Sequence, residues 1–173
     1  MKLEDRLKKI SVVLCDVDGV LTDGGIVYDN QGIETKRFHI RDGLGIKLWQ
    51  RAGHRLGLIT GRTSHVVQVR AAELGIDIVR QGFEDKLTLV RQLIGDLDVL
   101  PEQVCFIGDD LPDLPVLRHV GLAGSVADGA AEVQQTAHLV TERDGGQGAV
   151  RELIERLLKA QGRWDELVQK YLE

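Results

Sequence analysis

The sequence predicts an α/β fold: a doubly wound, Rossmann-like parallel sheet with a small β-hairpin beside it. Short apolar runs alternate along the 173 residues with stretches of helical spacing. The runs are continuously apolar, as in parallel strands that are covered on both faces. Neither an internal repeat nor a linker-like segment divides the sequence. We therefore expect a single domain over residues 1–173.

Six apolar runs are the predicted strands. They cover residues 12–17, 55–59, 76–80, 104–107, 120–122 and 139–140. The helical stretches between them give a βαβ order, which favours a parallel sheet with right-handed crossovers. Helical spacing of apolar residues indicates which faces turn to the core. These faces carry Val67, Ala71 and Leu74, then Leu87, Val90 and Ile94, then Leu111, Leu114 and Leu117.

One segment breaks the alternation of strand and helix. Residues 24–28 and 34–38 are β-prone and flank the turn-forming residues 29–32, so a hairpin flap is expected at about residues 24–40. A two-stranded hairpin is marginal in water by itself. We therefore expect it to rest on its own domain or on another subunit.

A helical tail is expected at about residues 149–173. Val150, Leu153, Ile154, Leu157 and Leu158 follow helical spacing, which predicts a helix docked on the core. The same spacing returns after Gly162. This second helix either docks as well or packs on a neighbouring subunit or over the active site.

Composition limits the classes of partner. The formal net charge is −5 and there is no basic tract, which argues against nucleic acid or an anionic membrane. No apolar run is long enough to cross a bilayer, and the charged first residues do not resemble a signal peptide. Cys15 and Cys105 lie in apolar runs, which favours free buried thiols over a disulfide. We expect a cytoplasmic protein.

Two aspartates mark the end of the first strand. Asp16 and Asp18 follow the apolar residues 12–15 and precede Gly19. Ligands of open α/β sheets bind at the carboxyl ends of the strands. Two neighbouring anions repel each other unless a cation or a shared proton intervenes. The pair therefore indicates a site for a divalent metal and a phosphate.

Phosphoryl transfer needs a nucleophile in line with phosphorus and neutralisation of the equatorial oxygens. Asp16 can attack phosphorus and form an aspartyl-phosphate, and Asp18 can act as general acid and base. Mg²⁺ prefers oxygen ligands. The carboxylates of Asp16 and Asp109 and the backbone carbonyl of Asp18 can supply them.

Other residues at strand ends and helix starts complete this arrangement. The hydroxyl of Thr60 and the N–H of Gly61 can bind phosphate oxygens. Lys86, near the start of a helix, is a compact cation that can hold Asp16 and the phosphate. Asp110 and Asp113 are better placed to support the metal ligands than to bind the metal.

Taken in order, these residues resemble the haloacid dehalogenase (HAD) superfamily of phosphatases. The matching motifs are Asp16-x-Asp18-Gly19, Thr60, Lys86 and Gly108-Asp109-Asp110-x-x-Asp113. The resemblance covers nearly the whole chain and implies a HAD-type fold with Mg²⁺ as cofactor. The gaps between motifs hold only the hairpin with one helix, and one helix with one strand, so there is no cap domain. An uncapped site is open to water.

A closer resemblance is to the 3-deoxy-D-manno-octulosonate 8-phosphate (KDO 8-phosphate) phosphatase branch. It rests on residues 16–24, 38–45, 60–62, 81–86 and 145–152. It implies hydrolysis of KDO 8-phosphate to KDO and phosphate in lipopolysaccharide precursor synthesis. The alternative is a nine-carbon sugar acid 9-phosphate, of KDN or an N-acylneuraminate, on which close relatives act.

The same resemblance implies a homotetramer in which the hairpins assemble and a neighbour's surface acts as the lid. Candidate substrate-binding residues are then Gly61, Arg62, Arg41 and Thr22, with the two arginines directed at the sugar carboxylate. The glycines of residues 145–148 either place amides near the substrate or form a flexible turn.

A receiver domain, which accepts a phosphoryl group as a switch without turnover, is the alternative from another class. It also has acids at a strand end, a later threonine and a lysine. The acid two residues after Asp16 and the late position of Asp109 and Asp110 favour the phosphatase. A regulatory domain with a dead site ranks last, because every residue that the chemistry needs is present.

Overall fold

The computed structural model describes residues 1–172 and contains a six-stranded parallel sheet. Its strands are β1 (Val12–Cys15), β4 (Arg55–Thr60), β5 (Ile78–Gln81), β6 (Val104–Gly108), β7 (Leu122–Ser125) and β8 (Leu139–Val140). They lie in the order β5-β4-β1-β6-β7-β8, and every pair is parallel. Strand order reverses direction beside β1, which is where open α/β sheets bind ligands. The predicted doubly wound sheet is confirmed.

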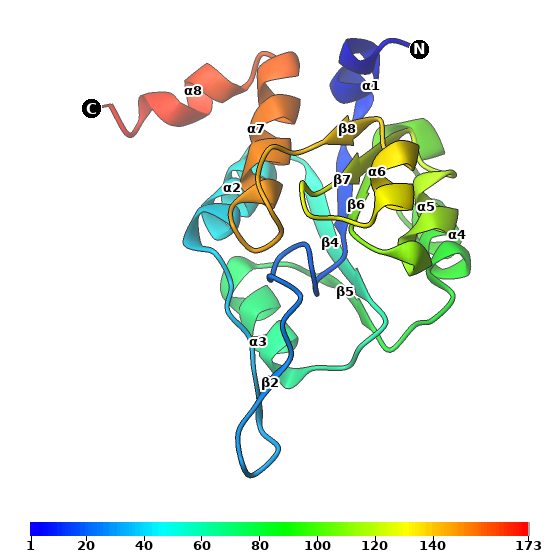
Figure 1. The fold of residues 1–173 in the computed structure, drawn as a ribbon. Helices are drawn as coiled ribbons and strands as arrows, with labels where there is room; N and C mark the ends of the chain where they lie inside the picture. The colour runs from blue at the N-terminus through cyan, green and yellow to red at the C-terminus, as the bar shows by residue number, and fades with distance from the viewer. Residues whose placement is uncertain (173) are drawn as a thin grey trace.

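Helices cover both faces of this sheet (Figure 1). One face carries α1 (Leu3–Lys9), α2 (Ile40–Arg51), α3 (His65–Leu74) and α7 (Ala149–Ala160), and the other carries α4 (Lys86–Asp96), α5 (Leu114–Leu117) and α6 (Ala131–Thr136). Two short 3₁₀ turns, η1 (Pro101–Gln103) and η2 (Leu111–Asp113), flank β6. Among the residues described, no helix has both the length and the apolar composition that a membrane crossing requires.

Helix α7 seals one face of the core. Its five apolar residues predicted to face inward, Val150, Leu153, Ile154, Leu157 and Leu158, are all buried. This i, i+3, i+4 spacing places one apolar stripe against the sheet and α2. The shorter α8 (Trp164–Gln169) has no fully buried residue and extends from the body of the molecule (Figure 1). Residue 173, the last of the predicted tail, lies outside the described residues.

Several details differ from the sequence-based expectation. Strand β1 ends at Cys15 instead of residue 17, and β5 begins at Ile78 instead of residue 76. Leu111 was expected to face the core but is 53% exposed, because it begins the 3₁₀ turn η2 rather than an α-helix. Val116, which the assumed spacing skipped, is buried in its place. Strand β7 begins at Leu122 instead of residue 120 and continues through Gly124 to Ser125.

The hairpin is present but short. Its strands are β2 (Val27–Tyr28) and β3 (Glu34–Thr35), paired antiparallel. The carboxylate of Asp29 accepts N–H groups of Gln31 and Ile33, each at 2.8 Å, and so closes the turn. The hairpin projects beyond the carboxyl end of the sheet (Figure 1).

Candidate active site

Asp16 lies directly after β1, and its backbone N–H still bonds to the Ile107 carbonyl of β6. Residues 17–22, here called the β1 turn, then fold back so that three successive N–H groups point at the Val17 carbonyl. Gly19 in this turn has φ +93°, and a Cβ there would lie 2.0 Å from Oδ2 of Asp109. Only glycine allows this close approach of the β1 turn to the carboxylate that follows β6.

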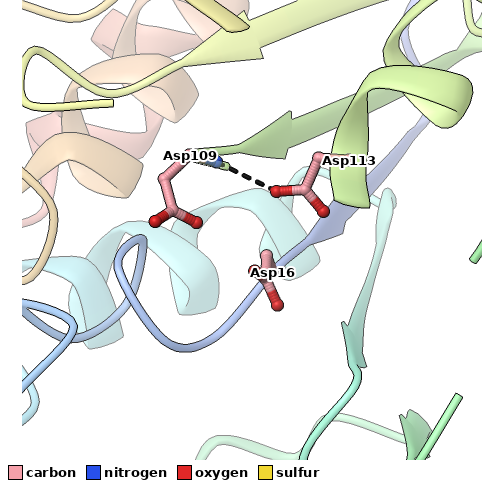
Figure 2. Close-up of side chains that lie close together, drawn as sticks. All are labelled: Asp16, Asp109 and Asp113. Atoms are coloured by element: carbon pink, nitrogen blue, oxygen red, sulfur yellow. Dashed lines mark hydrogen bonds between the residues drawn. The ribbon is translucent and has the colours of Figure 1, made fainter. Parts of the chain in front are cut away.

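Asp109 and Asp113 are brought in by β6 and the η2 turn. Asp113 is fully buried, and its Oδ2 accepts the N–H groups of Asp109 at 3.0 Å and Asp110 at 3.4 Å. Figure 2 shows the first of these bonds and the convergence of Asp16, Asp109 and Asp113 from the two neighbouring strand ends. The polar end of β6 is thus folded around the Asp113 carboxylate.

The three carboxylates form a cluster in which one oxygen from each lies within 4.8 Å of the others. Burial and the Asp113 charge raise the pKa of Asp16 to about 6. Burial and the charges of Asp16 and Asp113 raise the pKa of Asp109 to about 8. Oδ1 of Asp109 is buried and has no hydrogen-bond partner. An all-oxygen cluster with an unpartnered buried oxygen and mutual repulsion fits a hard divalent cation.

Lys86 supplies a cation to this cluster. It begins α4, whose first turn is capped by the Asp85 side chain through the Thr88 N–H at 3.0 Å. Its Nζ lies 3.1 Å from Oδ1 of Asp16 and 2.7 Å from Oδ1 of Asp113. Burial alone would lower the pKa of Lys86, but the two carboxylates outweigh it and hold the pKa above its ordinary value. Lys86 therefore stays charged.

A cavity of about 400 Å³ opens over this cluster. Its lining is polar at the base and includes Asp16, Asp18, Thr60, Gly61, Arg62, Lys86, Asp109, Asp110 and Asp113. Thr60 ends β4 and is buried, and its Oγ1 accepts the Arg62 N–H at 3.3 Å. The four sequence motifs therefore meet in one cavity, because the carboxyl ends of β1, β4 and β6 share one edge of the sheet.

The Asp18 side chain turns away from the carboxylate cluster and toward the hairpin. Its carboxylate forms an ion pair with Lys36, whose side chain is almost fully buried, and lies 3.9 Å from Nε of Arg62. Asp18 is therefore placed apart from Asp16, as a separate acid/base function requires. The sequence does not single out Lys36, because it lies within the β-prone run 34–38 of the hairpin and in none of the superfamily's four motifs.

Arg62 also connects the cavity to the hairpin. Its guanidinium donates hydrogen bonds to the Tyr28 hydroxyl at 3.0 Å and to the Glu34 carboxylate at 2.9 Å. These two bonds raise the pKa of Arg62. The base of the hairpin is therefore held against the rim of the cavity in its own chain. These contacts supply part of the support that an isolated hairpin needs.

Two predicted substrate-binding residues do not line this cavity. Thr22 is buried in the β1 turn, where its Oγ1 accepts the N–H groups of Gly19 and Gly24, each at 3.2 Å. It braces the turn instead of facing the cavity. Arg41 lies at the start of α2 and lines a separate cavity of about 540 Å³, formed mainly by residues of α7 and the segment before it. Within one chain, Arg41 and the carboxylate cluster belong to different cavities.

Comparisons with known proteins agree with this geometry. A family model described as haloacid dehalogenase-like hydrolase matches residues 40–121. The 3-deoxy-D-manno-octulosonate 8-phosphate phosphatase of Yersinia pestis is 45% identical over 156 residues, which are 90% of this chain and 83% of that protein. The enzyme of the same name from Escherichia coli K12 is 43% identical over 161 residues, 93% of this chain and 86% of that protein.

Solved structures show the same relationship. A probable YrbI family phosphatase from Pseudomonas syringae superposes with a TM-score of 0.97 at 45% identity, covering 99% of this chain and 97% of that one. The 3-deoxy-D-manno-octulosonate 8-phosphate phosphatase of Moraxella catarrhalis, solved with magnesium, phosphate and KDO, has a TM-score of 0.95 at 41% identity, with 97% of both chains covered. The chain is therefore a phosphatase and belongs to the 3-deoxy-D-manno-octulosonate 8-phosphate phosphatase family of haloacid dehalogenase-like hydrolases.

Proposed function

We propose that this chain is a Mg²⁺-dependent phosphatase that converts KDO 8-phosphate to KDO and phosphate, a step in forming lipopolysaccharide precursors. The observation that carries the proposal is the cluster of Asp16, Asp109 and Asp113 with Lys86 at the base of one cavity. The Moraxella catarrhalis relative, solved with magnesium, phosphate and KDO, supports both the cofactor and the sugar.

The choice of metal ligands depends on which carboxylate oxygens lack a hydrogen-bond partner. Both oxygens of Asp113 are engaged, Oδ1 by Lys86 and Oδ2 by backbone N–H groups. Asp109 keeps an unpartnered oxygen. We therefore assign the carboxylates of Asp16 and Asp109 and the backbone carbonyl of Asp18 as Mg²⁺ ligands, with Asp113 orienting Asp109 and Lys86. Bound Mg²⁺ would neutralise charge on the phosphate oxygens.

The protein's own groups account for the bond changes. The Asp16 carboxylate attacks phosphorus as the bond from phosphorus to the sugar oxygen breaks, and Asp18 donates a proton to that oxygen. The resulting aspartyl-phosphate is hydrolysed when Asp18, now ionised, takes a proton from the attacking water. Water oxygen ends on phosphate, and both aspartates return to their starting states.

Charge and hydrogen-bond donors around the phosphate assist these steps. Lys86 lies within 3.1 Å of Asp16 and holds the nucleophile while facing the phosphate position. The Thr60 hydroxyl and the Gly61 N–H bind phosphate oxygens. Arg62, at the mouth of the cavity, pairs with the sugar carboxylate.

Assembly completes the site in this proposal. The hairpin flap exposes Ile26, Val27, Tyr28 and Ile33, each more than half exposed. Such a group of apolar side chains marks a protein contact. We propose one phosphatase domain per chain over residues 1–173 and a cytoplasmic homotetramer in which hairpins pack together. A neighbour's surface then covers each cavity, and Arg41 reaches a sugar carboxylate across the subunit boundary.

Phosphate release from KDO 8-phosphate tests this function, with saturating Mg²⁺ and after chelation by EDTA. We expect Mg²⁺-dependent turnover with a higher kcat/KM for KDO 8-phosphate than for KDN 9-phosphate or N-acetylneuraminate 9-phosphate. A preference for a nine-carbon substrate would overturn the sugar assignment. Absence of Mg²⁺-dependent release from all three would overturn the function, and an aspartyl-phosphate that persists for minutes would favour a receiver-like switch.

The nucleophile is tested by Asp16→Asn. An amide oxygen can still accept the Val17 N–H that Oδ1 of Asp16 accepts at 2.8 Å, so the fold is expected to persist. Turnover is expected to be abolished, because an amide is not a nucleophile for phosphorus. Asp96→Asn, at an exposed aspartate ending α4, is the matched control and should retain full activity. Turnover by Asp16→Asn at the wild-type rate would remove Asp16 from this role.

A further inference from the structure

Asp42 is a buried carboxylate outside the active-site cavity. It lies in the first turn of α2 and is 1% exposed. Its Oδ1 accepts the N–H of Arg151 in the first turn of α7 at 2.7 Å. Burial raises the pKa of Asp42, and the N–H groups of Arg151, Gly148 and Val150 oppose this. No ion pair to Asp42 occurs within the described chain, and its Oδ2 is buried without a hydrogen-bond partner. The N–H of Arg151, in the first turn of α7, is therefore the hydrogen-bond donor that Asp42 contacts.

The N-terminal N–H groups of α7 receive no side-chain acceptor from the residue that precedes the helix. The N-cap residue of α7 is Gly148, which has no side chain and has φ +101°. The first N–H groups of a helix have no acceptor inside the helix, and a carboxylate near them is stabilising. Asp42 therefore caps α7 from a different helix. The two helices touch closely beside it, since a Cβ on Gly45 would lie 3.1 Å from the Arg151 Cα.

The segment that leads into α7 packs directly on the β1 turn. The Gly146 N–H donates to the Val20 carbonyl at 2.9 Å. A Cβ on Gly145 would lie 1.8 Å from the Gly19 carbonyl oxygen, and one on Gly146 would lie 2.5 Å from the Thr22 carbonyl carbon. The backbone of residues 145–146 thus packs directly on the backbone of the β1 turn, with no side chain between them. The glycines of residues 145–148 support the turn and do not act as a free loop.

The β1 turn is consequently held from two sides. On one side Gly19 lies against the Asp109 carboxylate, and on the other it lies against Gly145. The far end of the glycine segment is fixed separately, since the Gly145 N–H donates to Oδ1 of Asp128 at 2.8 Å. The other end of the segment, at Gly148, leads into α7, whose first turn is held by Asp42.

We propose that Asp42 is a positioning residue for catalysis: by capping α7 it fixes the glycine segment, which in turn fixes the Asp18 and Gly19 backbone. This inference rests on the proposed function, because Asp18 is the acid/base there. Loss of the cap lets the start of α7 and the glycine segment move. A displacement of about 1 Å at a catalytic group can cost about 10²-fold in rate. Binding of the phosphate by Thr60 and Lys86 does not depend on this contact.

Three variants test the inference: Asp42→Asn, Asp42→Ala and Gly145→Ala. The control is Gln161→Ala at the opposite end of α7, where Gln161 bonds to His54 and to the carbonyls of Leu7 and Ile10. For each variant, kcat and KM are measured with KDO 8-phosphate and with p-nitrophenyl phosphate at saturating Mg²⁺, and the unfolding midpoint in urea is measured alongside.

We expect kcat to fall by about tenfold or more in Asp42→Ala, and less in Asp42→Asn, which keeps one acceptor oxygen, while KM changes little. Gly145→Ala should also lower kcat. Gln161→Ala should lower the unfolding midpoint and leave kcat unchanged. Should Asp42→Ala fail to fold, Asp42→Asn decides the question.

Wild-type kcat in Asp42→Asn and Gly145→Ala would overturn the inference. So would an equal loss of kcat in Gln161→Ala and Asp42→Asn at equal loss of stability, since that result means general destabilisation. If the wild type hydrolyses neither substrate, the proposed function itself fails, which is a distinguishable outcome.

Discussion

Lys86 is the residue that balances charge at the base of the cavity. Three carboxylates, those of Asp16, Asp109 and Asp113, converge there, and Lys86 forms ion pairs with Asp16 and Asp113. One cation cannot neutralise three anions, so the site either holds a metal or takes up protons. The raised pKa values of Asp16 and Asp109 express that same imbalance in the metal-free protein.

Lys86→Met should be strongly destabilising. Removing one partner of a buried ion pair leaves the carboxylate of Asp113 uncompensated, which costs about 3–5 kcal/mol of the free energy of unfolding. Urea denaturation of the metal-free protein measures this loss. Lys159→Met is the control, because Lys159 pairs with Glu155 on the surface of α7 and such pairs contribute below about 1 kcal/mol. Equal losses in the two variants would contradict the assigned role.

Asp18→Asn tests the acid/base at the same scale. Without a proton to donate to the leaving oxygen, the single-turnover rate should fall by about 10²–10⁴. Rapid-quench measurements with KDO 8-phosphate follow this step. Asp23→Asn alters a nearby carboxylate that pairs with Arg37 on the surface and should leave the rate unchanged. An unaltered rate in Asp18→Asn would exclude the role.

The convergence of Asp16, Asp109 and Lys86 could be predicted from the sequence, but the surroundings of Asp18 could not. The carboxyl ends of the strands and the starts of the following helices lie at one edge of a parallel sheet. Residues that follow neighbouring strands are therefore brought together regardless of the conformation of the connecting loops. The Lys36 ion pair depends instead on how the hairpin folds back over the cavity. Arg41 shows the same limit, because the direction of the first turn of α2 is set by packing on α7.

Among the helices and strands, the buried ones are those whose positions the sequence predicts best. Strands β1 and β6 are nearly continuous apolar runs, β4 is buried from Leu56 onward, and α7 carries one continuous apolar stripe. The positions of these elements agree with the sequence-based ranges within a few residues. Strand β7 was shifted because Gly124 and Ser125 have low β-propensity, although both are buried beside β6. Leu111 was misplaced because Asp110 caps a 3₁₀ turn in which α-helical spacing does not apply.

The hairpin is the element on which assembly depends. Ile33→Asp places a charge among exposed apolar side chains of β2 and its turn, so the proposed tetramer should dissociate. Size-exclusion chromatography with light scattering measures the mass. Leu100→Asp, at a similarly exposed leucine before η1, is the control and should keep the wild-type mass. A wild-type monomer, or an unchanged mass in Ile33→Asp, would contradict this assembly.

For the whole molecule, the cluster links stability to pH. The pKa of Asp16 is raised to about 6 and that of Asp109 to about 8, so the metal-free folded state holds protons that the unfolded chain has released. The stability that this provides is fully present below the ordinary aspartate pKa of about 4 and is lost as pH rises toward 8. The melting temperature of the metal-free protein should therefore fall between pH 4 and 8.

Mg²⁺ should reverse this loss, since the cation replaces the protons. At pH 8 and a concentration 100-fold above its dissociation constant, the gain is about 2.7 kcal/mol, or roughly 5–10 °C in melting temperature. Differential scanning calorimetry measures both effects. Asp109→Asn should show a flatter pH profile and little response to Mg²⁺. A metal-free melting temperature that rises from pH 6 to 8 would contradict the linkage.

The tight fit around Gly19 also bears on how the enzyme can be engineered. A side chain at position 19 or 145 cannot be accommodated, because its Cβ would lie closer than van der Waals distance to a carboxylate or to backbone atoms. Libraries intended to broaden substrate range should leave both codons untouched. Diversity belongs at Phe83, Glu84 and Pro112, which line the cavity from its exposed rim and leave the carboxylates where they are.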